Sequence, residues 1–339
     1  DSLEYFEVLD IYALCLRLCL FELAFYIRKK SLSIALGYSI STKSESWKLK
    51  AKLSALLETS NFSEFDQLFP LFKSRNKKEK YLLSYLRDVF SDKKYPLFVN
   101  PDTNKESEID QKFRKFVESK KIVIVSPSPA DKKDGYEIDR SDIVIRTNYK
   151  KGDPIFKGSR CDISYFNLQT AEYISEYGYL KWPLDISWVV ARVFGQVDLI
   201  LKRLFSDEVD IEHLSGRSLE RVDKVLFYGS LTGLQTIILD LIRFNPREVF
   251  LYHFDVMLTQ QRVSGYYPKI NKDKEFHLKM IKCFPEHDPV TNFLILKSFW
   301  KQGFIKGDYR FEEVIKMETR DYMKNLQENY RKGNIFEIE

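Results

Sequence analysis

The chain has 339 residues, 44% of them hydrophobic and 30% charged, which is typical of a globular protein that buries a full core. The net charge of +5 is compatible with an anionic small ligand or an anionic membrane surface, but it is too small to indicate a nucleic-acid-binding protein. The four cysteines form no C-x-x-C pair and the four histidines lack metal-ligand spacing, so we expect a reducing compartment and no metal site.

The amino-terminal part, residues 1–92, reads as a small helical subdomain. Residues 6–27 are apolar enough to suggest a membrane span, but four charges interrupt them at positions that cannot all face one side: Glu7, Asp10, Arg17 and Glu22. We therefore predict one buried amphipathic helix there, and further helices at 47–57, 62–72 and 78–90. Their apolar faces suggest packing against the sheet, a neighbouring subunit or a membrane surface, and the residues on these faces are Leu14, Phe21, Phe25, Leu53 and Leu57.

Residues 93–120 form a polar connector with a helix expected at 107–119. From residue 121 the pattern changes to short β-branched runs, which predict strands at 122–125, 143–145, 163–166, 186–190, 224–228 and 248–253. Helices are expected at 168–179, 196–205, 234–244 and 290–302, and a charged loop with short helices at 207–221. This alternation predicts an α/β, Rossmann-like, mostly parallel sheet over 121–310, followed by a carboxyl-terminal helix and tail at 311–339.

Two of the predicted strands end in polar residues. The first is followed by S-P-S-P, where two prolines turn the chain and leave the hydroxyls of Ser126 and Ser128 at the strand's carboxyl end. The second runs into Arg146 and Asn148, a cation and an amide that arrive at the same edge. Open α/β sheets bind ligands at this edge, so these residues suit a sugar nucleotide. An ordinary Rossmann half with solvated strand ends fits equally well. Neither G-x-G-x-x-G nor G-x-x-x-x-G-K-[ST] occurs, which argues against dinucleotide and P-loop chemistry.

The later part of the chain carries three further polar segments. The turn G-S-L-T-G at 229–233 lets backbone N–H groups approach a ligand, although a tight helix N-cap is an equally good interpretation. The loop Q-Q-R-V-S-G-Y-Y-P-K at 260–269 offers Tyr266, Tyr267 and Lys269 as donors to phosphate, or aromatic packing of a lid-like loop. His287 lies between two prolines before the helix predicted at 290–302, as a candidate catalytic base or a structural residue.

In this order the segments resemble the CMP-sugar-dependent sialyltransferases, especially the bacterial type that decorates surface glycans. The sequence IDRSDIVIRTN at 138–148 is similar to the I-D-x-x-D-x-V-I-R-x-N motif of the animal enzymes, and 158–167 contains G-x-x-C-x-x-x-x-x-N. Residues 230–255 resemble their second motif, S-T-G before a helix and a strand. Residues 286–288 resemble the last motif, a histidine that opens a helix. The resemblance covers residues 121–307.

The resemblance implies a sialyltransferase-type variant of the GT-A fold. It implies transfer of sialic acid, or of a related 2-keto acid sugar such as Kdo, from a CMP-sugar to a hydroxyl of a glycan or glycolipid acceptor. No metal or other cofactor is expected. The implied setting is lipooligosaccharide or capsule biosynthesis in the cytoplasm, at the inner face of the bacterial cytoplasmic membrane. Peripheral membrane association and a homo-oligomer are both compatible with it.

Carried over by position, the resemblance implies that His287 is the general base and that Tyr266 and Tyr267 grip the phosphate. The expected substrate-binding residues are Ser126, Ser128, Arg146, Asn148, Asn167, Ser230, Thr232, Gly233, Asp255 and Lys269. The chain departs from the family at P-S-P, where G-N-G is usual, and at Gly229, near which the bacterial type has an arginine. A transferase that uses a UDP or GDP donor, and a non-catalytic nucleotide- or carbohydrate-binding module with His287 as a helix cap, remain alternatives.

Overall fold

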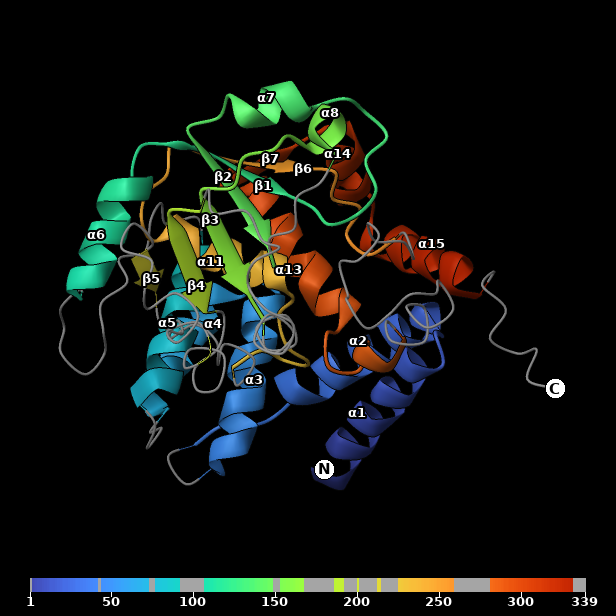
Figure 1. Ribbon diagram of the computed structural model, residues 1–339. Coiled ribbons are helices and arrows are strands. Elements are labelled where there is room, and N and C mark those ends of the chain that lie inside the picture. Colours follow the sequence, from blue (N-terminus) through green and yellow to red (C-terminus); the bar gives the residue numbers. More distant parts are fainter. Residues whose placement is uncertain are drawn as a thin grey trace.

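The computed structural model describes residues 2–41, 44–72, 77–91, 107–148, 153–167, 186–191, 200, 212–214, 225–258 and 281–331. At its centre lies a parallel sheet in the order β5-β4-β3-β2-β1-β6-β7 (Figure 1). Its strands are β1 (Lys121–Val125), β2 (Ile143–Thr147), β3 (Ile163–Phe166), β4 (Trp188–Ala191), β5 (Glu212–Leu214), β6 (Glu248–Tyr252) and β7 (Ile305–Gly307). The α/β class with a parallel sheet is confirmed.

The strand order reverses between β1 and β6. From β1 the chain adds β2, β3, β4 and β5 on one side, and it then returns to place β6 and β7 on the other. Strands β1 and β6 are in register, with Val125 beside Tyr252 at their carboxyl ends. In open α/β sheets, a crevice forms outside the carboxyl ends of the strands where the order reverses. This sheet therefore has its topological switch point just beyond Val125 and Tyr252.

Helices cover both faces of the sheet. On one face, α7 (Gly135–Asp139) and α8 (Pro154–Lys157) lie at the top of Figure 1. Val123 and Val125 of β1 point to this face and pack with Ile138 of α7. Ile122 and Ile124 point to the opposite face, because side chains alternate along a strand. That second face belongs to the large core, which includes residues of α6 (Glu108–Val117), α11 (Gly233–Ile242) and α13 (Pro289–Lys301).

The amino-terminal helices are part of this same core. They are α1 (Ser2–Arg17), α2 (Phe21–Leu36), α3 (Ser46–Glu58), α4 (Phe62–Leu68), η1 (Phe69–Leu71) and α5 (Lys77–Phe90). Phe21, Leu53 and Leu57 are buried in one hydrophobic cluster with residues of the sheet, and Phe25 packs against it. Packing against the sheet layer is thus confirmed for these four residues, whereas the prediction for Leu14 was wrong, because its side chain is 54% exposed. No helix in the described ranges is both long and apolar enough to cross a membrane.

Four predictions about elements were wrong. The single helix expected at 6–27 is two helices, because the chain breaks at Cys19, which has a positive φ of 53°. Residues 225–228, the described part of the strand expected at 224–228, are irregular, because Phe227 packs with Tyr5 and Tyr38 of the amino-terminal layer. The region 207–221, expected to be loop and short helix, contributes strand β5. The carboxyl-terminal part forms two helices, α14 (Tyr309–Lys316) and α15 (Thr319–Arg331).

The remaining predictions divide into confirmed elements and untested ones. Helices α3, α5, α6, α11 and α13 lie within two residues of their predicted bounds, and α4 with η1 fills 62–71. The helix expected at 168–179 lies outside the described residues, as does 196–205 apart from residue 200. The proposed boundaries at residues 92, 120 and 310 stay predictions.

Candidate functional site

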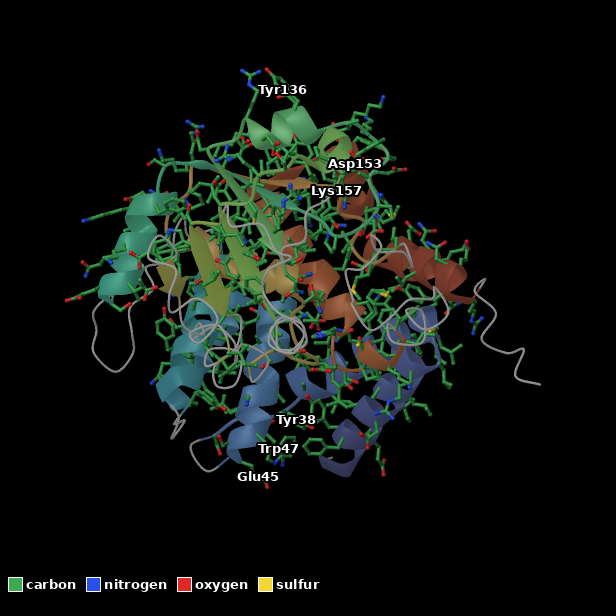
Figure 2. All side chains as sticks on the ribbon, in the orientation of Figure 1. Tyr38, Glu45, Trp47, Tyr136, Asp153 and Lys157 are labelled. Atoms are coloured by element: carbon green, nitrogen blue, oxygen red, sulfur yellow. The ribbon has the colours of Figure 1, made fainter. Side chains whose placement is uncertain are left out.

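The turn after β1 is closed over a buried lysine. Lys157 of α8 donates to the carbonyl oxygens of Ser126, at 2.8 Å, and of Ser128. The Ser126 hydroxyl accepts from the Ser128 backbone N–H at 3.0 Å, and both serines are buried. Lys157 of α8 therefore fixes the S-P-S-P turn at the switch point. Figure 2 shows Lys157 at the α7–α8 end of the molecule, opposite the end that carries Tyr38 and Trp47.

A second cation joins the same turn to the strand on its other side. Arg310 of α14 donates to the carbonyl oxygen of Pro129 at 2.9 Å and lies 3.3 Å from the Asp255 carboxylate. Asp255 is buried and also accepts from the Met257 backbone N–H at 3.1 Å. Two cations, Lys157 and Arg310, thus hold the segments that leave β1 and β6 in a defined conformation.

The ends of β2 and β3 are tied together by the expected residues. Asn148 adopts a positive φ of 50°, and its side-chain oxygen accepts from the backbone N–H of Asn167 at 2.9 Å. Arg146 donates to the carbonyl oxygens of Lys157 (2.6 Å), Gly158 (3.1 Å) and Arg160 (2.9 Å). The structure brings Asn148 and Asn167 into contact, and it directs three guanidinium bonds of Arg146 to the backbone. Arg146 therefore shapes the loop that carries Lys157.

The turn at 229–233 meets His287 directly. The Ser230 hydroxyl donates to the Glu286 carbonyl oxygen at 3.0 Å and lies 3.1 Å from Nδ1 of His287. We assign the Ser230 proton to the Glu286 carbonyl oxygen, and with this assignment the Ser230 oxygen accepts from Nδ1–H of His287. This assignment leaves the ring lone pair of neutral His287 on Nε2, the form that a general base requires.

Two further residues hold the turn against α13. The amide of buried Asn292 accepts from the Thr232 N–H at 2.8 Å and donates to the carbonyl oxygens of Ser230 (3.0 Å) and Asp288 (2.8 Å). Gly229 has a φ of +71°, and a Cβ there would lie 2.6 Å from Cβ of Asp288. Only glycine permits this approach, so the arginine of the bacterial type could not occupy this position. Gly233 is the first residue of α11.

The S-P-S-P turn, the Asn148–Asn167 contact and the 229–233 turn all lie at the carboxyl edge of the sheet. Ser126, Ser128 and Asp255 follow β1 and β6, while Asn148 and Asn167 follow β2 and β3. Helices α11 and α13 are followed by β6 and β7, so the segments before these helices, which contain Ser230 and His287, lie at the opposite, carboxyl edge. Tyr266, Tyr267 and Lys269 lie outside the described residues.

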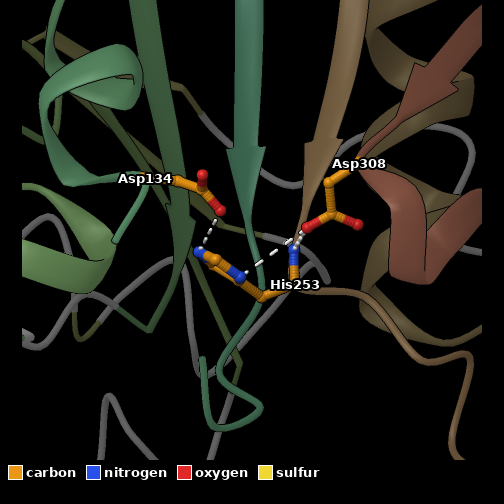
Figure 3. A group of neighbouring side chains, drawn as sticks. All are labelled: Asp134, His253 and Asp308. Carbon is orange, nitrogen blue, oxygen red and sulfur yellow. Dashed lines mark hydrogen bonds and ion pairs between the residues drawn. The ribbon is translucent and has the colours of Figure 1, made fainter. Parts of the chain in front are cut away.

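A histidine between two carboxylates lies beside the switch point. Nε2 of His253 is 3.8 Å from Asp134 and 3.1 Å from the Phe156 carbonyl oxygen, and Nδ1 is 3.6 Å from Asp308 (Figure 3). Burial lowers the pKa of the imidazole below its ordinary value, although both carboxylates act in the opposite direction. One ligand atom from each of these three residues lies within 4.8 Å of the others, as a bound cation would need. However, the carboxylates face different ring nitrogens, whereas a metal ion takes one, so the arrangement fits a proton-binding group better.

Sequence reasoning missed Lys157, Arg310, Asn292 and Asp288. All four bind backbone atoms or partners far away in the chain, with separations of up to 276 residues. The one local signal was Asp288 before Pro289, which is a helix N-cap pattern.

Comparison with known proteins adds little. No known protein family and no curated protein matches the sequence. Among solved structures, the chain is similar to a crystal structure of a mammalian sialyltransferase in complex with Gal-beta-1-3GalNAc-ortho-nitrophenol. The similarity covers 80% of this chain and 88% of that one, with 13% sequence identity and a TM-score of 0.39. These values carry no argument about activity, so the residues of the chain itself have to supply it.

Proposed function

We propose that the chain is a glycosyltransferase that moves sialic acid, or a related 2-keto acid sugar such as Kdo, from a CMP donor to a hydroxyl of a glycan or glycolipid. The proposal includes a fold of the sialyltransferase-type GT-A variant and a role in surface-glycan biosynthesis at the cytoplasmic side of the bacterial membrane. It rests on the motif resemblance of residues 121–307 together with the placement of the motif residues at one edge of the sheet.

The observation that carries the proposal is the contact between Ser230 and His287. Transfer at an anomeric carbon requires the acceptor hydroxyl to lose a proton while the phosphate leaves. His287 is fixed just before α13, and Ser230 orients its ring through Nδ1 at 3.1 Å. The lone pair on Nε2 can then accept the hydroxyl proton, a role that contributes about 10²–10⁴-fold to a rate.

We propose that residues at the switch point and in the loop at 260–269 stabilise the negative charge of the departing phosphate. Lys157 and Arg310 bind the carbonyl oxygens of Ser126, Ser128 and Pro129, and so fix the S-P-S-P turn at the switch point where the phosphate is proposed to bind. Tyr266, Tyr267 and Lys269 are proposed to complete the phosphate contacts from the loop at 260–269. With this set of donors, we expect transfer without an obligatory metal ion.

A thermal-shift comparison of CMP, CDP, UDP and GDP at equal concentration tests the donor class. A ligand that binds only the folded chain raises its melting temperature by mass action, so CMP should give the largest shift. A larger shift with UDP or GDP would favour a different donor and contradict the family assignment. Release of CMP in the presence of glycan acceptors then separates an enzyme from a non-catalytic nucleotide-binding module.

A further inference from the structure

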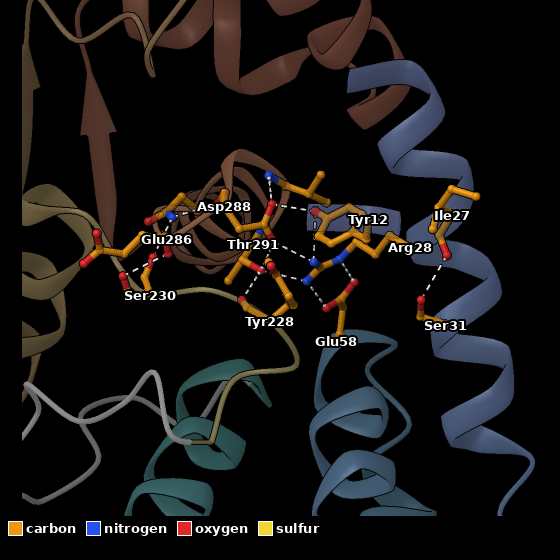
Figure 4. A network of polar contacts seen from close by, with 12 residues as sticks. Tyr12, Ile27, Arg28, Ser31, Glu58, Tyr228, Ser230, Glu286, Asp288 and Thr291 are labelled. Atoms are coloured by element: carbon orange, nitrogen blue, oxygen red, sulfur yellow. Dashed lines mark hydrogen bonds and ion pairs between the residues drawn. The ribbon is translucent and has the colours of Figure 1, made fainter. Parts of the chain in front are cut away.

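A buried arginine connects the amino-terminal helices to the candidate catalytic turn. Arg28 of α2 is 1% exposed, and its guanidinium donates to Glu58 of α3 at 2.8 and 2.6 Å. It also donates to Asp288 at 2.5 Å, across a sequence separation of 260 residues (Figure 4). Although burial alone would lower it, the two carboxylates keep the pKa of Arg28 raised, so the charge persists.

Tyr12 of α1 binds the same carboxylate from another side. Its hydroxyl donates to Asp288 Oδ1 at 2.6 Å and accepts from Arg28 at 3.2 Å. Burial raises the pKa of Tyr12 well above its ordinary value, so the hydroxyl stays protonated as a donor. The fully buried Asp288 carboxylate is therefore oriented by two helices that belong to the first 36 residues of the chain.

Asp288 transmits this orientation to the catalytic turn. Its carboxylate accepts from the backbone N–H groups of Val290 (3.0 Å) and Thr291 (3.3 Å), and from the Thr291 hydroxyl at 2.6 Å. It is the N-cap of α13, and the residue that precedes it is His287. A shift of Asp288 would therefore move both the first turn of α13 and the imidazole that contacts Ser230.

A helix cap alone does not need such a network. Asp308 caps α14 and Ser107 caps α6 through their own side chains, and within the described part of the chain neither binds a fully buried arginine. Burying an ion pair often brings little net stability, because desolvation offsets the Coulombic attraction. What the network at Asp288 supplies is a defined geometry, since a planar guanidinium fixes two carboxylates at once.

We propose that Tyr12 and Arg28 are positioning residues for the transfer reaction, and that the amino-terminal helices are therefore a working part of the catalytic site. Tyr12 and Arg28 hold the Asp288 carboxylate, and Asp288 in turn positions His287 for its contact with Ser230. This inference rests on the proposed function, in which His287 is the base.

Tyr12→Phe is the sharpest test, because it removes one hydroxyl and keeps the ring that packs edge-on against Tyr228 at 4.9 Å. Tyr85→Phe is its matched control, since the Tyr85 hydroxyl is equally buried and donates to the Leu239 carbonyl oxygen at 2.7 Å, outside the Asp288 network. Tyr12→Phe should lower kcat about tenfold with an unchanged KM for the donor, as expected for a misplaced catalytic group. Tyr85→Phe should keep kcat within about twofold at a comparable loss of melting temperature.

A second readout does not depend on activity. In protein labelled with 13C and 15N at its four histidines, the His287 ring signal, assigned by its loss in His287→Gln, should move in Tyr12→Phe and stay in place in Tyr85→Phe. A wild-type chain that transfers no sugar from CMP donors would refute the proposed function. The His287 signal would still show whether Tyr12 positions the imidazole. Unchanged kcat together with an unchanged His287 signal in Tyr12→Phe would overturn it.

Discussion

At the scale of single residues, Gly229 sets how closely the 229–233 turn approaches α13. Gly229→Ala would place a Cβ 2.6 Å from Cβ of Asp288 at a φ of +71°. We expect a loss of about 1–3 kcal/mol of stability together with a lower transfer rate, because Ser230 and His287 would separate. Gly303→Ala is the control: its φ is +73°, but nothing lies within 4 Å of the added Cβ. Gly303→Ala should have the same backbone strain but an unchanged transfer rate. Equal losses of rate in both variants would contradict the claim that close packing of Gly229 against Asp288 positions Ser230 and His287.

His253 should make stability depend on pH. Its folded-state pKa is lowered from 6.5, mainly by burial, while Asp308, Asp134 and the Phe156 carbonyl favour the charged form and Lys157 opposes it. The unfolded chain therefore binds more protons at this position, so stability is complete above pH 6.5 and is lost as the pH falls toward the lowered pKa. Urea unfolding between pH 7.5 and 5.5 should show a smaller loss in His253→Gln than in wild type. Identical pH profiles would assign the loss to other groups.

At the scale of elements, Lys157 connects α8 to the end of β1. Lys157→Met keeps most of the volume but leaves the carbonyl oxygens of Ser126 and Ser128 without their cation. Removing hydrogen bonds to a charged group costs about 1.5–3 kcal/mol each, so the turn should loosen. We expect weaker CMP binding, measured by calorimetry, with a smaller effect on kcat at saturating donor. Unchanged CMP affinity would show that the nucleotide binds away from the switch point.

Local sequence patterns predicted the central strands, because short runs rich in β-branched or aromatic residues, such as Ile122–Val125 and Ile163–Phe166, are buried on both faces of the sheet. They failed at Cys19, where a positive φ ends α1 without a glycine, asparagine or proline to signal it. They also failed at Val225–Tyr228, where Phe227 packs with Tyr5 and Tyr38 while Val225 belongs to the large core. At both positions the side chains are buried against residues distant in the sequence, and local patterns do not carry such contacts.

In the candidate site too, local motifs predicted some residues, whereas residues that act through distant contacts were missed. The motif pattern brought out Ser230, Thr232 and His287, which do lie together. It could not reveal Asn292 or Arg310, since the contacts of Asn292 with Ser230 and of Arg310 with Pro129 and Asp255 span 55 to 181 residues. A single sequence carries no sign of such pairings.

At the scale of the whole molecule, the amino-terminal helices and the sheet share one hydrophobic core. Deletion of residues 1–92 should therefore give an aggregated or unfolded chain, because it exposes that core and leaves Asp288 buried without Arg28. Arg28→Met alone should cost about 3–5 kcal/mol, the usual effect of removing one partner of a buried ion pair. Size-exclusion chromatography and urea unfolding measure both effects. A folded, fully active monomer of residues 93–339 would contradict this account.

The central claim is that His287 takes the proton of the acceptor hydroxyl, and the direct measurement is the transfer rate of purified His287→Ala with a CMP-sugar donor and a working acceptor. Because this loss falls in the transition state, kcat should drop by about a hundredfold or more while CMP binding stays nearly unchanged. A His287→Ala enzyme that turns over within about twofold of wild type would contradict the account and leave His287 as a residue before a helix cap.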